Sequence, residues 1–359
     1  MPTTPEPINV FDYERLAEQS LDPGAYGYFA GGAGDEVTLA DNLAAFRRWQ
    51  LRPRVLVDLS EAATDTTVLG VPVSMPLLVA PAAFQRLAHP DGEAATARAA
   101  AKADTVMCLS TFATSSPAEV AEAAPGGRRW FQLYVYKDRG ITRSLVDQAL
   151  DSGYSAIVVT VDAPFLGRRE RDLRSGFAIP ADLPVPSFEQ ATGRDEPITV
   201  FRMFDLIDES LTWRGIEELA SLSDLPLLVK GILTDDDARL CVESGAAGVI
   251  VSNHGGRQLD GVPAALDALP EVVEAVESSA EVLVDGGVRR GTDVVKALAL
   301  GARAVLAARP FVWGLAVDGE AGVRNVLELL REEIRLALAL TGCTSPGAVT
   351  RAHVQRAPR

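Results

Sequence analysis

The sequence predicts a (β/α)8 barrel, and three observations along its 359 residues support this fold class. Helical segments that end in glycine are repeatedly followed by a short apolar run, as expected for a left-handed helix end and a strand buried on both faces. Eight such runs occur, most of them about 20–30 residues apart, the length of one βα unit. No Gly-x-Gly-x-x-Gly follows any run, so the sequence lacks the phosphate fingerprint of an open dinucleotide-binding sheet.

The elements can be justified in order along the chain. Residues 1–70 precede the first strand and are expected to wrap the outside or the floor of the barrel, which spans about 74–345. Helices should begin after Ser116, which opens a capping box with Pro117 and Glu119, and after Thr234, which precedes three aspartates. We expect the eight strands at Leu77–Ala80, Val106–Ser110, Trp130–Leu133, Ala156–Val161, Leu227–Lys230, Gly248–Val251, Val282–Asp285 and Ala304–Ala307.

One interval between strands is far longer than the others. Gly167–Trp213 is rich in proline and charge, and we expect its main part, about 170–213, to form a lid over the barrel mouth. The tail Thr350–Arg359 is expected to be a solvated, frayed end. The whole chain, 1–359, is predicted to be a single barrel domain.

Composition narrows the classes of function. The chain carries 34 Lys and Arg against 49 Asp and Glu, a net charge of −15, which argues against nucleic acid or anionic membranes as partners. Its 47% of hydrophobic residues excludes extensive disorder. The three cysteines are widely spaced without a Cys-x-x-Cys pair, so a disulfide framework or structural zinc site is not expected. Without a signal peptide or a span of about 20 apolar residues, the protein is predicted to be soluble and cytoplasmic.

Polar residues concentrate at the C-terminal ends of the predicted strands, where active sites of this fold lie. Any one of them could cap a helix or form a local ion pair, but their convergence on one mouth favours a functional site. This set comprises Ser110, Gln132, Tyr134, Thr160, Asp162, Lys230, Ser252, His254, Arg257, Asp285, Arg289 and Arg309.

His254 is the leading catalytic candidate among three histidines. It follows the sixth strand, with Gly255 and Gly256 allowing close backbone approach and Arg257 beyond them. A neutral imidazole there is suited to accept a proton near pH 7. A structural role or metal binding is the alternative, but no second histidine lies at ligand spacing, and no metal is predicted.

Arginines and glycines at the same mouth indicate anionic ligands. Arg168 and Arg169 follow the fourth strand and could be solvated or paired with nearby acids, but a carboxylate clamp shared with Arg257 fits their position. Phosphate commonly binds after the last two strands of such barrels, where Asp285–Arg289 and Ala308–Pro310 lie. The residues alone therefore predict a phosphate-bearing ligand, a histidine base and an anionic substrate.

The run Ser-Asn-His-Gly-Gly-Arg-Gln-Leu-Asp at Ser252–Asp260 resembles the signature of the FMN-dependent 2-hydroxy acid oxidases and dehydrogenases. The resemblance covers nearly the whole chain apart from the lid and the termini. It extends through Phe131-Gln132-Leu133-Tyr134, Thr160-Val161-Asp162, Gly167-Arg168-Arg169, Leu228-Val229-Lys230-Gly231 and Asp285-Gly286-Gly287 to Gly342-Cys343, and it includes Tyr26.

The resemblance implies a role for each matching residue. His254 is the implied base, Asp162 orients it, Tyr134 bonds the substrate hydroxyl, and Lys230 lies beside the flavin. The substrate carboxylate would meet Tyr26, Arg169 and Arg257, and the substrate side chain would lie near Phe112 and Leu166. FMN would contact Pro81, Ala82, Ala83, Ser110, Gln132, Thr160, Lys230, Ser252, Asp285, Gly286, Gly287, Arg289, Ala308 and Arg309.

The implied reaction is oxidation of an (S)-2-hydroxy acid to the 2-oxo acid, with O2 reduced to H2O2. The resemblance also implies that the protein is a homotetramer. A dehydrogenase that passes electrons to a quinone, a flavin-free phosphosugar isomerase or lyase, and a non-catalytic binding protein are the alternatives. Two positions depart from the family: Ala308 replaces the usual glycine, and Phe112 replaces the tryptophan of plant glycolate oxidases. The second departure predicts a side-chain pocket that accepts an apolar or aromatic group, so the expected substrate is a mandelate- or 4-hydroxymandelate-like acid, with lactate and glycolate as the alternatives.

Overall fold

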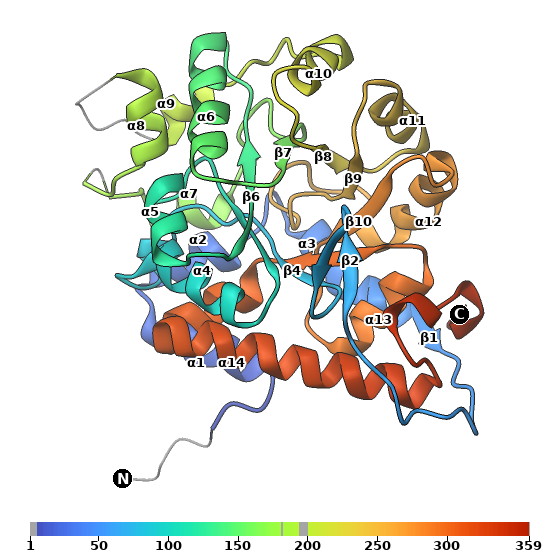
Figure 1. Cartoon of the computed structure of the whole chain (residues 1–359). Helices are drawn as coiled ribbons and strands as arrows, with labels where there is room; N and C mark the ends of the chain where they lie inside the picture. The colour runs from blue at the N-terminus through green and yellow to red at the C-terminus, as the bar shows by residue number, and fades with distance from the viewer. Residues whose placement is uncertain (1–5, 181, 194–199, 359) are drawn as a thin grey trace, which may run out of the picture.

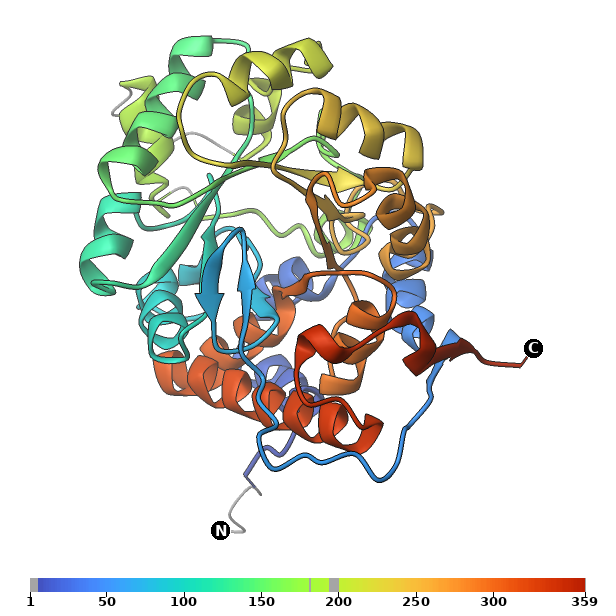
Figure 2. The ribbon, with the colours of Figure 1, turned by 45° about the vertical axis from the view of Figure 1, so that its right-hand side comes forward.

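A closed barrel of eight parallel strands forms the centre of the computed structural model, which describes residues 6–180, 182–193 and 200–358 (Figures 1 and 2). Around the barrel the strand order is β10-β11-β4-β5-β6-β7-β8-β9. The strands are β4 (Leu77–Val79), β5 (Val106–Leu109), β6 (Arg128–Leu133), β7 (Ile157–Thr160), β8 (Leu227–Ile232), β9 (Gly248–Val251), β10 (Glu281–Asp285) and β11 (Ala304–Ala307). The predicted fold class and all eight predicted strands are confirmed.

Alternate residues of each strand face the barrel interior. Val106 and Cys108 of β5 belong to the interior cluster together with Trp130 of β6, whereas Met107 and Leu109 pack outward under the helices. The hairpin of β2 (Thr66–Val68) and β3 (Val71–Val73) adds Val68 and Val73 to the interior cluster and so closes the barrel floor. The core is therefore filled with side chains, and ligand space is left at the mouth.

The helices surround the strands, as Figure 2 shows. They are α4 (Gly92–Lys102), α5 (Pro117–Ala123), α6 (Arg139–Asp151), α10 (Trp213–Ala220), α11 (Asp235–Glu243), α12 (Ala265–Val276), α13 (Gly291–Ala299) and α14 (Arg309–Thr341). The predicted capping box of Ser116 and Glu119 begins α5, and the Thr234 hydroxyl accepts from the Asp237 amide at the start of α11. Asp318 and Gly319 interrupt α14 with non-helical backbone.

The N-terminal region divides between the outside, the floor and the mouth of the barrel. Helix α1 (Val10–Ser20) packs on α14 (Figure 1), and the β2–β3 hairpin covers the floor, as expected. Helix α2 (Pro23–Ala30) instead reaches the mouth, and it is followed by α3 (Val37–Ala45), the 3-10 helix Phe46–Arg48 and β1 (Trp49–Leu51). The expectation for residues 1–70 was therefore incomplete, because α2 contributes to the ligand cavity.

The predicted lid contains three short helices, α7 (Glu170–Ser175), α8 (Pro186–Thr192) and α9 (Val200–Asp205). Residues 181 and 194–199 of the predicted lid lie outside the described residues.

None of the helices in the described part of the chain has the length and apolar character that a membrane span requires.

The expectation of a frayed tail is wrong for its described residues. After the 3-10 helices Pro346–Ala348 and Arg351–His353, β12 (Val354–Arg356) pairs antiparallel with β1. The guanidiniums of Arg351 and Arg356 lie 4.7 and 4.9 Å from the ring centre of Trp49. Strand pairing and these cation–π contacts anchor the tail to the N-terminal region.

Candidate active site

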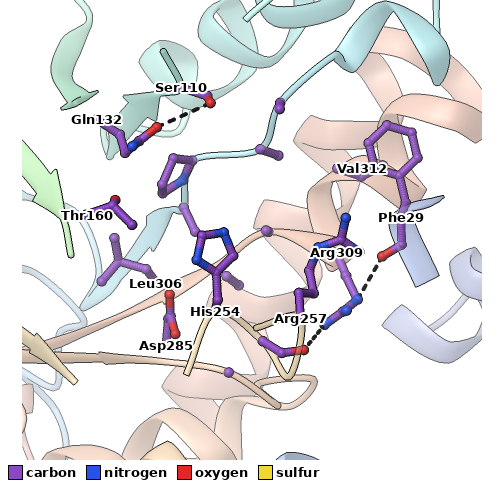
Figure 3. Close-up of a pocket in the computed structure, with 18 of the residues that line it drawn as sticks. Phe29, Ser110, Gln132, Thr160, His254, Arg257, Asp285, Leu306, Arg309 and Val312 are labelled. Carbon is purple, nitrogen blue, oxygen red and sulfur yellow. Dashed lines mark hydrogen bonds between the residues drawn. The ribbon is translucent and has the colours of Figure 1, made fainter. Parts of the chain in front are cut away.

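A cavity opens at the mouth, where the C-terminal ends of the strands meet α2 and the lid (Figure 3). In Figure 3 the imidazole of His254 lies between Gln132 and Thr160 on one side and Arg257 and Arg309 on the other. The predicted site residues that line this cavity are Pro81, Ala82, Ala83, Ser110, Phe112, Gln132, Tyr134, Thr160, Arg169, Lys230, His254, Arg257, Asp285, Gly286, Gly287, Arg289, Ala308 and Arg309.

Two of the predicted site residues do not line the cavity but form hydrogen bonds to residues that do. Asp162 lies next to His254, with its Oδ1 2.8 Å from the histidine Nδ1. The Ser252 hydroxyl receives hydrogen bonds from the Lys230 ammonium at 2.9 Å and from the His254 amide at 3.0 Å. Asp162 and Ser252 therefore position the residues that face the ligand.

The structure does not bring Tyr26 and Leu166 to the cavity. The ring of Tyr26 packs on Trp313, with ring centres 5.4 Å apart, and Leu166 packs against the core cluster. Tyr28 lines the cavity instead. Residues two apart in a helix point in nearly opposite directions, so only one of the two tyrosines of α2 can face the mouth. The helical phase of Pro23–Ala30 was the signal that sequence analysis missed.

Three phenylalanines that line the cavity could not be assigned to the site from the sequence. Phe29 comes from α2, Phe84 from the loop after β4, and Phe204 from α9 in the lid. Their positions depend on how distant segments fold over the barrel mouth. An isolated aromatic residue in a loop or short helix gives no indication of such packing.

His254 is held by both its backbone and its ring. Its φ is +59°, a left-handed conformation that is uncommon outside glycine and clusters at functional sites. Gln258 donates to the main-chain oxygen of Asp162 at 2.9 Å and so fixes the loop that carries the carboxylate. Burial lowers the pKa of His254 although Asp162 opposes this effect, so the imidazole is neutral at pH 7 and able to accept a proton.

Lys230 is a buried cation at the end of β8. Burial alone would lower its pKa, but the carboxylates of Asp285 and Asp162 outweigh that effect and raise it. One Asp285 oxygen lies 3.3 Å from the ammonium. The ammonium is therefore charged at pH 7 and provides a fixed positive charge beneath the cavity.

Arg257 and Arg309 lie on the other side of His254 and are buried cations. The negative charge near them does not offset the cost of burying their own positive charge. Burial and the neighbouring Arg169 lower the pKa of Arg257 to about 10, and burial with Arg257 and Arg289 lowers that of Arg309 to about 9. Arg257 donates to the Tyr28 carbonyl at 2.6 Å, and Arg309 donates to the Phe29 carbonyl at 2.9 Å. Carbonyls fix these side chains but carry no charge, so the cluster favours an anionic ligand.

Five buried polar atoms of the lining residues have no hydrogen-bond partner among the described residues. They are Gln132 Nε2, Thr160 Oγ1, Arg169 Nε, Asp285 Oδ1 and Arg289 Nε. Buried polar groups in native proteins are almost always satisfied, so these atoms indicate a polar ligand of some length. Nearby, the N-terminus of α14 and the left-handed Gly286 and Gly287 form the kind of positive backbone site that binds phosphate. The residues therefore fit FMN.

A phosphate site, a buried cation and a histidine base on one barrel mouth are the features that a flavin-dependent oxidoreductase of small anionic substrates requires. Comparison with known proteins agrees, because residues 17–356 match the family of FMN-dependent dehydrogenases. The chain belongs to this family, and the predicted cofactor is confirmed as FMN.

Individual relatives are similar over almost their full length. An L-lactate oxidase from Nostoc sp. is 54% identical, with 94% of this chain and 95% of the relative covered. The human 2-hydroxyacid oxidase 1 is 52% identical, with 99% and 98% covered. The crystal structure of a mandelate oxidase superimposes with a TM-score of 0.91 at 43% identity, with 98% of this chain and 99% of that chain covered.

Proposed function

We propose that this protein oxidises (S)-2-hydroxy acids to 2-oxo acids with FMN and delivers the two electrons to O2, which yields H2O2. The observation that carries the proposal is the Asp162–His254 pair, whose histidine faces the same cavity as Arg257 and Lys230. The oxidase names of the relatives support O2 as the electron acceptor.

The arginine cluster would hold the substrate carboxylate. Arg169 and Arg257 both face the cavity, and their guanidiniums lie 5.8 and 5.0 Å from the ring centre of Tyr28. The planar fork of an arginine matches both oxygens of a carboxylate. Tyr28, in place of the predicted Tyr26, would then add its hydroxyl to this site.

His254 would accept a proton from the substrate. Its neutral ring would accept this proton at Nε2, because Nδ1 faces Asp162. The imidazolium that forms would be stabilised by the Asp162 carboxylate, whose pKa is kept low by His254 and Lys230 in spite of its burial. Tyr134 lines the same cavity, and its hydroxyl would orient the substrate oxygen.

Lys230, Gln132, Thr160, Asp285, Arg289 and the start of α14 would hold the cofactor. When bound, FMN supplies the two-electron acceptor for the oxidation. The Lys230 ammonium would stabilise negative charge that develops next to it, which a fixed and buried cation does more strongly than a solvated one. The predicted single domain and homotetramer remain predictions, and light scattering of the purified protein tests the second.

The test is a spectrum followed by two half-reactions. Purified protein should show flavin absorbance, lose it anaerobically on addition of a 2-hydroxy acid, and regain it with O2 while H2O2 forms. A colourless protein that cannot be reconstituted with FMN would favour the isomerase alternative. Flavin that is reduced by substrate but reoxidised only by a quinone would favour the dehydrogenase.

A further inference from the structure

A cluster of aromatic rings closes one wall of the cavity. The ring centres of Phe112 and Tyr134 lie 5.2 Å apart, and Phe204 lies 5.3 Å from Phe112 and 5.8 Å from Tyr134. All three residues line the cavity. Phe112 and Tyr134 belong to the barrel, but Phe204 is contributed by α9 of the lid. Three rings in mutual contact leave no room for a fourth ring between them.

Phe112 is also fixed from its other side. Phe84 stacks on it with ring centres 6.1 Å apart and planes only 7° from parallel. The next residue, Gln85, donates its amide to the fully buried carboxyl of Glu93, which also accepts from the amide of Thr114. Only 2% of Phe112 is exposed. Phe112 therefore cannot swing aside to enlarge the pocket without displacing two held loops.

We propose that Phe204 is a specificity-determining residue, because it forms the lid-borne wall of the substrate side-chain pocket and restricts the substrate to short aliphatic 2-hydroxy acids. The smaller ring of Phe112, where plant glycolate oxidases carry tryptophan, opens no space here because Phe204 occupies it. This inference rests on the proposed function and deepens it. It also favours lactate- or glycolate-sized acids over the mandelate-like acids that the sequence predicted.

The test compares three variants by the ratio of kcat/KM for (S)-mandelate to that for (S)-lactate. Phe204→Ala should raise the ratio about tenfold or more, the gain expected for a newly buried phenyl ring, and Phe204→Leu should raise it less. Phe188→Ala is the matched control: Phe188 is a buried lid phenylalanine in α8 that packs on Tyr136, 5.3 Å away, and does not line the cavity. Its ratio should stay at the wild-type value.

Binding provides a readout independent of turnover. The Kd of phenylglyoxylate, measured from the change in flavin absorbance, should fall in Phe204→Ala relative to that of pyruvate. An unchanged ratio in both Phe204 variants, or an equal change in Phe188→Ala, would overturn the inference; if the alanine variant does not fold, the leucine variant decides. Wild-type flavin that no 2-hydroxy acid reduces would instead contradict the proposed function.

Discussion

His254 combines two features that each cost stability, a left-handed backbone and a buried ionisable ring. Such strain persists only where the surroundings hold the residue in place. Here the Ser252 hydroxyl binds its amide and Asp162 binds its ring. The imidazole is thereby aimed at the cavity, and its neutral form is favoured before any substrate arrives.

Replacing His254 with alanine should separate cofactor binding from chemistry. We expect His254→Ala to retain FMN, because the unpartnered polar atoms and the phosphate site lie on other residues. Anaerobic flavin reduction by a 2-hydroxy acid should slow by roughly 10²–10⁴-fold, the contribution of a positioned base. Stopped-flow absorbance measures this rate, and reduction at the wild-type rate would remove His254 from the mechanism.

The pH dependence should reveal the part played by Asp162. Burial holds the pKa of His254 below 6.5, so the wild-type kcat/KM should fall only as the pH drops below that value. The Asp162 carboxylate opposes this shift, and its removal lowers the histidine pKa further. Asp162→Asn should therefore move the acidic limb of the profile to lower pH.

The same variant should also react more slowly at every pH, because the imidazolium loses its counter-ion. Asp162→Asn keeps the size of the side chain, and an unchanged circular dichroism spectrum would show that folding is intact. An acidic limb that stays in place or moves to higher pH would contradict the assigned coupling between Asp162 and His254.

Among the elements, the first turn of α14 is the one that we expect to hold the FMN phosphate. Ala308 is the cap residue, with φ −110° and ψ −66°, and Arg309 and Pro310 follow at the cavity. A negative φ is open to every L-residue, so alanine in place of the family's glycine causes no left-handed strain. Its backbone amide remains available at the positive end of the helix.

Ala308→Gly should consequently leave FMN affinity almost unchanged. Had the site required a positive φ, alanine would cost about 1–2 kcal/mol, and glycine would bind FMN roughly tenfold tighter. Fluorescence titration of apoprotein with FMN gives the Kd of both proteins. A markedly tighter glycine variant would show that alanine disturbs the phosphate site.

Elements differ in how well the sequence predicts them. The barrel strands were predictable because burial on both faces requires a continuous apolar run, and the residues that follow them gave most of the site. The pairing of β12 with β1 could not be predicted in this way, because the paired residues, such as Trp49 and Arg356, are about 300 positions apart in the sequence. The choice between Tyr26 and Tyr28 required the helical phase of α2, and the place of Phe204 required the lid packing.

In the molecule as a whole, folding brings four cations into one cavity of a protein whose net charge is −15. They are Arg257, Arg289, Arg309 and Lys230. The lowered pKa of each of the three arginines shows that burial disfavours their charged forms. An anion at the mouth relieves this cost only in the folded state. FMN should therefore contribute to global stability as well as to chemistry.

Removal of FMN should lower the thermal midpoint, and re-addition should restore it. A ligand at 1,000 times its Kd stabilises a folded protein by about 4 kcal/mol. Riboflavin, which has the same ring system without the phosphate, should restore much less, because it leaves Arg309 and the start of α14 without an anion. Scanning calorimetry of apoprotein with equal excesses of the two flavins measures the difference. Equal stabilisation by both would show that the ring contacts, and not the phosphate site, anchor the cofactor.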